Sequence, residues 1–307
     1  MDYIKGFTYG FMAPKGSYKT DMAKESLVTL ANEININTVI FAVAALQDTA
    51  QSVVIDYKGE HIVDDNELIE MIRYAQSLGL DTILKPMVNV RSGTWRAHIC
   101  FFDEDVPCEP KWSDWFKEYT EFQCHYAKIA RQTNCKMLIV GCEMVQSEKR
   151  ENEWRNVINE VRKHYDGLIS YNTDKYQEDR LTWWDAVDVI SSSGYYPIDD
   201  WDNQLKRIEK VVKKHCKPFF FAEAGCPSRA GASFIPYDWT KLTSVDLNEQ
   251  KKYYEVMFDK VAEYPFVKGF GLWEWHNNLY KTDSAKQDDS YGVFGKPAIE
   301  VIKQEFS

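Results

Sequence analysis

Two short apolar segments of this chain each lead into a glutamate. Residues 219–222, Phe-Phe-Phe-Ala, run directly into Glu223, and residues 137–140, Met-Leu-Ile-Val, run through Gly141 and Cys142 into Glu143. Apolar runs of this length are typical of strands buried on both faces. A carboxylate at the end of such a strand is costly to desolvate unless a partner or a reaction uses it. Both glutamates are therefore candidate catalytic residues, with a structural ion pair as the alternative for each.

Two carboxylates that face each other across a sugar can hydrolyse a glycosidic bond. One of them, in its protonated form, donates a proton to the leaving oxygen, and the other, ionised, attacks the anomeric carbon. A separation of about 5–5.5 Å between the two groups leads to retention of configuration. This chemistry requires a fold that brings Glu143 and Glu223 together.

The rest of the chain predicts such a fold. Short apolar segments predict eight strands at residues 4–10, 38–46, 81–88, 137–140, 168–172, 187–191, 218–222 and 267–273. Helical spacing or capping residues predict helices at 21–34, 64–79, 113–133, 151–165, 201–215, 248–264 and 296–306. Eight strand–helix units indicate one α/β domain over residues 1–307, a closed (β/α)8 barrel of the TIM type. An open doubly wound sheet is the alternative, but its usual G-x-G-x-x-G turn is absent from the sequence.

Polar and aromatic residues gather at the ends of the predicted strands, where barrels of this class carry their active sites. These candidate substrate-binding residues are Lys85, Asn89, Trp95, Arg96, Asn172, Tyr195, Tyr196, Trp273 and Trp275. Strand alternation predicts that Trp273 and Trp275 share one face. Each residue alone could be a salt-bridge partner, a packed ring or a rim residue, but together they suit the hydroxyls and flat faces of sugar rings.

Composition limits the classes of partner. The chain has 307 residues and a formal net charge of −10, with ten Trp and eighteen Tyr. An acidic chain without a basic patch does not favour nucleic acid or an anionic membrane as a partner. No apolar run approaches the ~20 residues that span a bilayer. We therefore expect an oligosaccharide or polysaccharide as the partner, and the sequence makes no prediction of an oligomeric state.

The seven cysteines indicate a compartment. Their number is odd and no C-x-x-C pair occurs, which is typical of free thiols in a reducing environment. The first residues do not resemble a signal peptide. We expect a cytoplasmic protein, or a secreted one if a leader has been removed.

A metal-dependent hydrolase and a non-catalytic sugar-binding protein are the two alternative classes. A metal-dependent hydrolase needs clustered ligands, but the six histidines show no H-x-H or H-x-x-x-H spacing, so we expect no metal and no cofactor. Asp283, Asp288 and Asp289 could form a calcium site, although a solvated acidic loop is favoured. A non-catalytic sugar-binding barrel would gain little from two facing carboxylates that repel each other.

Short motifs along nearly the whole chain resemble clan A of the glycoside hydrolases and, within it, family 113, whose characterised members are mainly β-1,4-mannanases. The matching pieces are Lys85-Pro86, Trp95-Arg96, Gly141-Cys142-Glu143, Trp154-Arg155, Tyr195-Tyr196-Pro197 and Glu223-Ala224-Gly225. The resemblance implies that Glu143 is the acid/base and Glu223 the nucleophile. It also implies that Tyr195 hydrogen-bonds the nucleophile and that Trp273 stacks under the sugar at the cleavage subsite.

One position departs from the clan pattern. Many clan A enzymes place Asn immediately before the acid/base, where it binds the sugar 2-hydroxyl, whereas this chain has Cys142, a weak hydrogen-bonding group. We expect Asn172 or Lys85 to hold that hydroxyl instead. Mannose and glucose differ at this carbon, so an exo-acting β-mannosidase, or a β-xylosidase or β-glucosidase acting on short oligosaccharides, is the alternative to a mannanase.

Overall fold

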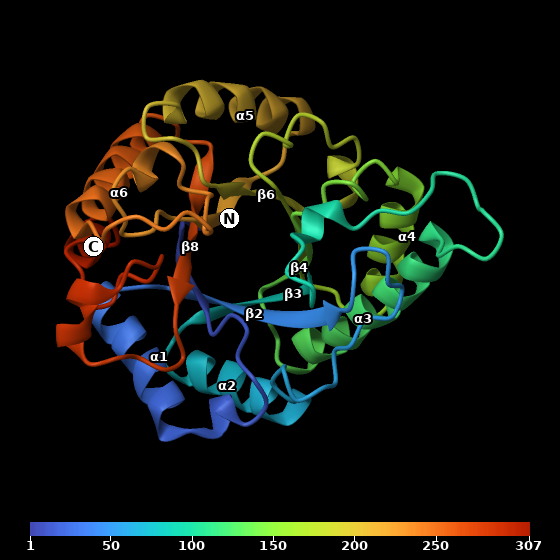
Figure 1. The fold of residues 1–307 in the computed structure, drawn as a ribbon, viewed down its shortest axis with the longest axis horizontal. Helices are drawn as coiled ribbons and strands as arrows, with labels where there is room; N and C mark the ends of the chain where they lie inside the picture. The colour runs from blue at the N-terminus through green and yellow to red at the C-terminus, as the bar shows by residue number, and fades with distance from the viewer.

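The computed structural model describes residues 1–307, in which eight parallel strands form one closed barrel in chain order (Figure 1). The strands are β1 (Ile4–Tyr9), β2 (Thr38–Gln47), β3 (Asp81–Val90), β4 (Met137–Cys142), β5 (Leu168–Thr173), β6 (Val189–Gly194), β7 (Phe219–Ala224) and β8 (Val267–Trp275). The predicted (β/α)8 barrel is confirmed. All eight strands begin and end within three residues of the predicted segments because each is a short apolar run with clear boundaries.

Seven α-helices surround the strands as an outer ring (Figure 1). They are α1 (Asp21–Ile34), α2 (Asp65–Ser77), α3 (Trp112–Gln132), α4 (Glu151–Arg162), α5 (Trp201–His215), α6 (Leu247–Ala262) and α7 (Ala298–Glu305). The acidic residues expected to open the second helix form a capping box, in which Asp64 and Glu67 each accept a hydrogen bond from the other's backbone N–H. None of the helices is long and apolar enough to cross a membrane.

The sequence predicted eight strand–helix units, but β5 and β6 are joined without an α-helix. Only a 3-10 helix, Trp184–Ala186, lies between them. A buried carboxylate organises this connection, because Glu178 accepts a hydrogen bond from Ser192 Oγ at 2.5 Å and forms an ion pair with Arg207 of α5 at 2.5 Å. The indole of Trp183 stacks on that of Trp154 at 5.3 Å. Aromatic packing therefore covers β5 where a helix would otherwise lie.

An apolar floor fills the lower part of the barrel. Eight buried side chains from six strands contact one another, which is possible only inside the closed sheet; they are Ile4, Ile40, Ile83, Met137, Ile139, Val189, Phe220 and Ala222. A separate core of 76 residues lies between the strands and the helices. Two strand positions further along, the interior becomes polar, with Lys85 above Ile83 and Asn172 on β5, both fully buried. The floor thus places charged groups at the carboxyl end of the barrel, away from bulk water.

Closure of the barrel depends on a glycine in β8. Gly269 pairs with Ile4 of β1 and has a φ of 113°, and a Cβ at this position would lie 2.1 Å from the Ile4 carbonyl oxygen. We expect Gly269→Ala to lower the free energy of unfolding by roughly 3 kcal/mol or more, since backbone strain is one of the few causes of large losses. Urea unfolding followed by circular dichroism measures this change.

Gly79→Ala is the matched control. Gly79 also has a positive φ, 84°, but a Cβ there would meet no atom within 4 Å. The control should therefore lose only about 1–2 kcal/mol, the cost of placing an L-residue in the left-handed region. Equal losses in the two variants would show that the close approach of β8 to β1 does not matter for closure.

Candidate active site

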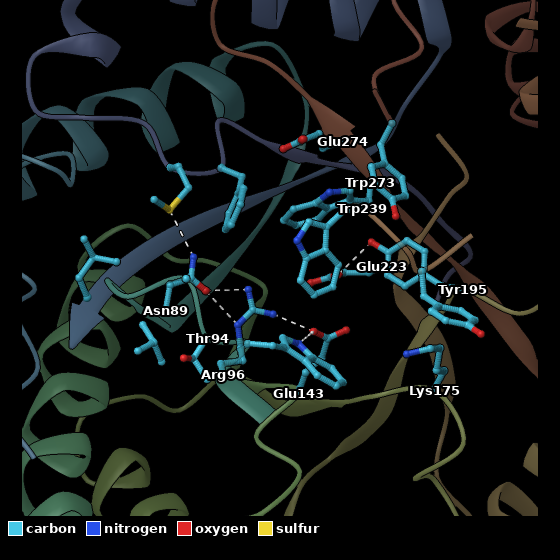
Figure 2. Close-up of a pocket in the computed structure, with 18 of the residues that line it drawn as sticks. Asn89, Thr94, Arg96, Glu143, Lys175, Tyr195, Glu223, Trp239, Trp273 and Glu274 are labelled. Carbon is cyan, nitrogen blue, oxygen red and sulfur yellow. Dashed lines mark hydrogen bonds and ion pairs between the residues drawn. The ribbon is translucent and has the colours of Figure 1, made fainter. Parts of the chain in front are cut away.

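A cleft of about 490 Å³ opens at the carboxyl ends of the strands, and Glu143 and Glu223 both line it (Figure 2). Both carboxylates are nearly buried, with 6% and 3% of the residue surface exposed. Residues from β2, β3, β8 and the loops after β1, β3, β5, β6, β7 and β8 form the rest of the wall. The barrel thus brings the two glutamates, which are far apart in the sequence, into one site.

Glu143 follows the last residue of β4 in an unusual backbone conformation. Its φ is 53°, in the left-handed region that non-glycine residues adopt only where the surroundings hold them. Its backbone N–H donates to the Asn172 carbonyl at 2.8 Å. One carboxylate oxygen accepts from Arg96 at 2.8 Å and from Trp95 Nε1 at 3.1 Å, and the other accepts from Ser193 Oγ at 2.8 Å. Three donors therefore fix this carboxylate at the wall of the cleft.

Asn89 holds the arginine that contacts Glu143. The Asn89 side-chain oxygen accepts hydrogen bonds from Arg96 Nε at 3.0 Å and from Arg96 Nη2 at 2.8 Å (Figure 2). This bidentate contact leaves Nη1 free to reach Glu143. Asn89 therefore orients a charged group beside the carboxylate, as well as lining the cleft itself.

Glu223 is held by a different set of groups. Lys85 Nζ forms a buried ion pair with Oε1, Cys142 Sγ donates to the same oxygen at 3.2 Å, and the Tyr195 hydroxyl donates to Oε2 at 3.0 Å. Burial raises the pKa of the Glu223 carboxyl, but the charges of Lys85 and Arg96 and the hydrogen bonds from Lys85 and Cys142 lower it more. The pKa of Glu223 therefore lies below its ordinary value, and the group is ionised at neutral pH.

Lys85 lies beneath the cleft, not in its wall. Its side chain is fully buried, donates to Asn172 Oδ1 at 3.1 Å, and has its ammonium 5.6 Å from the centre of the Trp273 ring. Neither Lys85 nor Asn172 lines the cleft. The expectation that one of them holds a sugar hydroxyl therefore lacks structural support, and both residues instead support Glu223 from below.

The cleft contains five of the nine predicted substrate-binding residues, namely Asn89, Trp95, Arg96, Tyr195 and Trp273. Trp275 is not among them, so the prediction that Trp273 and Trp275 share one face is wrong. Between the pairs Phe7–Leu272 and Tyr9–Trp275 the register with β1 shifts, so that β8 has one more residue than its partner. Such a bulge reverses the alternation of side chains. Trp275 therefore points outward and is buried, donating to Ser26 Oγ of α1 at 3.0 Å.

Tyr196 also lies outside the cleft. It is fully buried, and its hydroxyl donates to Glu178, the carboxylate that organises the β5–β6 connection. Its ring packs edge-on against Trp201 of α5 at 5.2 Å. The neighbouring Tyr195 faces Glu223, because successive residues of an extended segment point in opposite directions.

Several cleft residues were missed in the sequence. Lys175, two positions after β5, lies 4.6 Å from the Tyr237 ring centre and 5.3 Å from that of Trp95, and pairs with Asp174 at 3.1 Å. Other missed cleft residues include the aromatic residues Phe11, Tyr237, Trp239 and Tyr291, and Ser193, which donates to Glu143 but does not line the cleft, was also missed. The polar pair directly after β5 was a usable signal for Lys175. No feature of the sequence identifies the loop aromatics as cleft residues, because their position depends on contacts between loops.

No group of three His, Cys, Asp or Glu side chains in the structure is arranged to hold a metal ion. In the acidic loop, Asp288 pairs with Lys296 at 2.9 Å and Asp289 pairs with Arg229 at 3.0 Å. Two of the three loop carboxylates that were considered for calcium, Asp288 and Asp289, are thus neutralised by cations of the protein. All seven cysteines of the protein are free thiols.

A closed (β/α)8 barrel, with one glutamate directly after β4 and another at the end of β7 in one aromatic cleft, defines a glycoside hydrolase. The model of Glycoside Hydrolase Family 113 matches residues 7–296, and the chain belongs to this family. No curated protein sequence matches the chain.

Solved structures agree with the family assignment. A complex of a family 113 β-1,4-mannanase is 59% identical with a TM-score of 0.99, covering 100% of this chain and 99% of its own. The β-mannanase AaManA from Alicyclobacillus acidocaldarius, in complex with ManMIm, is 42% identical with a TM-score of 0.96, covering 100% and 97%. A Ruminococcus gnavus β-glucuronidase, 14% identical with a TM-score of 0.67, covers 100% of this chain and 50% of its own and shares the fold alone.

The ion pair between Lys85 and Glu223 leads us to predict how the activity of a Lys85 variant depends on pH. Lys85→Met removes the charge that lowers the pKa of Glu223 while burial continues to raise it. The pKa of Glu223 should rise, so less carboxylate exists at acidic pH and the acid limb of kcat/KM should move upward by about 1–3 pH units. The pH dependence of aryl β-glycoside hydrolysis measures this shift.

Lys175→Met provides the matched control, because Lys175 is a lysine of the cleft wall that pairs with Asp174 and not with Glu223. This variant should keep the acid limb of the wild-type enzyme. An acid limb that stays in place in Lys85→Met would mean that the ammonium does not set the ionisation of Glu223.

Proposed function

We propose that this protein hydrolyses β-1,4-linked mannan or manno-oligosaccharides with retention of configuration, using Glu143 as acid/base and Glu223 as nucleophile. The observation that carries the proposal is the different set of donors around each carboxylate in the same cleft. A buried ammonium, a phenol and a thiol hold Glu223 ionised. Glu143 instead lies between Arg96, Trp95 and a serine hydroxyl. This asymmetry suits a pair with two distinct roles.

In the first step, the Glu223 carboxylate attacks the anomeric carbon while the bond to the leaving oxygen breaks. Glu143 gives its proton to that oxygen, so the sugar residue that leaves departs as a neutral alcohol. Arg96 then stabilises the Glu143 carboxylate that remains. As Glu223 forms the glycosyl ester its negative charge is lost, and Lys85 retains Asn172 as a hydrogen-bond acceptor.

In the second step, Glu143 takes a proton from water, and the oxygen of that water attacks the anomeric carbon from the face that the leaving group vacated. The ester bond breaks and Glu223 regains its negative charge beside Lys85 and Tyr195. The ammonium therefore stabilises the nucleophile as a leaving group in this step. Two inversions give net retention.

The choice of mannose rests on the relatives. The two family 113 structures described above are a β-1,4-mannanase and a β-mannanase, and both are similar to this chain over its full length. Cys142 occupies the position where many clan A enzymes have Asn, and its thiol donates to the nucleophile at 3.2 Å. A thiol that is engaged with Glu223 is a poor partner for the sugar 2-hydroxyl, whose orientation distinguishes mannose from glucose, so the relatives alone carry the choice of mannose.

The substrate assignment is tested with aryl β-mannoside, β-glucoside and β-xyloside beside manno-oligosaccharides of increasing length. We expect the mannoside to have the highest kcat/KM of the aryl glycosides, and mixed short products from the longer oligosaccharides. Proton NMR during hydrolysis should detect the β-anomer first. A faster glucoside or xyloside would overturn the sugar, release of mannose alone would favour the exo-acting alternative, and an α-anomer first would overturn retention.

The two roles are tested with a matched pair of variants, Glu223→Ala and Glu143→Ala. Glu223→Ala should lose turnover of every glycoside, and added azide should restore activity and yield the α-glycosyl azide, because azide enters from the face of the missing nucleophile. Glu143→Ala should lose about 10²–10⁴-fold more on substrates with poor leaving groups than on activated aryl glycosides, since general acid help is worth that much.

Azide should give Glu143→Ala the β-glycosyl azide by attacking the glycosyl-enzyme. Circular dichroism establishes that both variants are folded, and NMR identifies the azide products. The same azide anomer from both variants, or an equal loss on both substrate types in Glu143→Ala, would contradict the assignment of roles.

A further inference from the structure

Glu274 is a carboxyl group in the cleft that the double-displacement mechanism does not use. It follows Trp273 in β8 and lines the cleft with it. In the view of Figure 2, the Trp239 indole separates Glu274 from Glu143. Its position beside Trp273 places it on the part of the cleft wall that continues toward Phe11, whose ring packs against Trp273 at 4.7 Å.

The protein provides no partner for Glu274. Its carboxyl oxygens take part in no hydrogen bond and no ion pair, whereas Glu143, Glu223 and Glu178 each have three or more partners. The nearby cation Lys296 is occupied by Asp288 at 2.9 Å. The Glu274 side chain is half-buried and lines the cleft, so the partner of its carboxyl oxygens comes from outside the protein, from water when the cleft is empty and from a ligand when the cleft is occupied.

The charge state of Glu274 defines the kind of partner. Burial, and after it the negative charges of Glu223 and Asp288, raise the pKa of Glu274 to about 8. At neutral pH the group therefore carries a proton for which the protein offers no acceptor. A carboxylic acid of this kind donates one hydrogen bond through its hydroxyl and accepts through its carbonyl oxygen, which matches a sugar hydroxyl in both directions.

We propose that Glu274 is a sugar-binding residue, whose neutral carboxylic acid exchanges hydrogen bonds with a hydroxyl of the sugar that lies over Trp273. This inference deepens the proposed function and rests on it, because it takes the substrate to be a glycoside bound in the same cleft. It assigns Glu274 no proton transfer to the leaving group. Because Glu274 adjoins Trp273 in β8 and lines the same cleft as Glu223, we assign the hydroxyl to the sugar that Glu223 attacks.

The test uses aryl β-glycosides in which the 3-, 4- or 6-hydroxyl of the sugar is replaced by hydrogen. The series is prepared from whichever parent glycoside the wild-type enzyme cleaves fastest. A preference for glucose or xylose would therefore overturn the proposed mannose specificity without affecting the test of Glu274. Loss of a hydroxyl also changes the intrinsic reactivity of the glycoside, but this change is the same for every variant and cancels in the ratio of kcat/KM values.

We expect wild-type kcat/KM to fall about 10- to 100-fold for one of the three deoxy substrates, the size of a hydrogen bond left unmade in a buried site. Glu274→Ala should lose a similar factor on the parent glycoside and almost nothing further on that same deoxy substrate. Glu274→Gln, which still donates and accepts, should stay within about tenfold of the wild-type enzyme on the parent. Thr94→Ala, at another part of the cleft wall, should keep the wild-type ratio for each deoxy substrate.

Three results would overturn the inference. The first is a Glu274→Ala variant that responds to all three deoxy substrates as the wild-type enzyme does. The second is a folded Glu274→Gln variant as impaired as Glu274→Ala, which would indicate a charge instead of a hydrogen bond. The third is a loss in Glu274→Gln that is confined to poor leaving groups, which would make Glu274 an acid catalyst and would also contradict the role given to Glu143.

Discussion

The buried ion pair between Lys85 and Glu223 is the interaction on which the site depends. A carboxylate and an ammonium removed from water are each costly, and their attraction compensates only when good geometry and further hydrogen bonds satisfy both groups. The structure meets this requirement with Asn172 below the ammonium and with Tyr195 and Cys142 around the carboxylate. The two residues are 138 positions apart in the chain, so only the closed barrel brings them together. The apolar floor beneath them excludes water from the lower side.

The same pair extends into a hydrogen-bonded chain between the two glutamates. Glu223 contacts Lys85, Lys85 donates to Asn172, Asn172 donates to Ser193 at 3.0 Å, and Ser193 donates to Glu143 at 2.8 Å. The chain crosses β7, β3, β5, β6 and the end of β4 inside the barrel. Since each link satisfies a buried polar group, moving one carboxylate would leave its neighbours unsatisfied. The relative position of Glu143 and Glu223 is therefore a property of the barrel interior and not of the loops around it.

Features that depend on neighbouring residues in the chain could be predicted from the sequence, whereas features that depend on contacts between distant residues could not. The strands and their order were predictable because apolar runs and turn residues are local signals, and Glu143 and Glu223 stood out because each ends such a run. Trp275 was misassigned because the bulge in β8 arises from pairing with β1, which strand periodicity does not encode. Lys85 was expected in contact with substrate, but burial beneath Glu223 depends on a partner far along the chain. Although eight strand–helix units were inferred, no helix was placed between the fifth and sixth strands, and the structure has none there; the ion pair between Glu178 and Arg207 in this region is a long-range contact that the sequence did not indicate.

The walls of the cleft are held by contacts between loops, whereas the two glutamates are held by contacts inside the barrel. Lys175 joins three loops, since its ammonium lies over Trp95 from the loop after β3 and over Tyr237 from the loop after β7. Arg229 joins two parts of the same β7 loop by donating to the Lys241 carbonyl at 2.7 Å, and it links this loop to the one after β8 by donating to the Asp289 carbonyl at 3.0 Å. These contacts join side chains to rings and carbonyls that lie partly in solvent, so they constrain the cleft less tightly than the ion pair inside the barrel. In the proposed mechanism, rate and recognition are therefore separate properties, because the barrel interior fixes the two carboxylates to which we assign the reaction, while the loop contacts shape the cleft that the sugars enter.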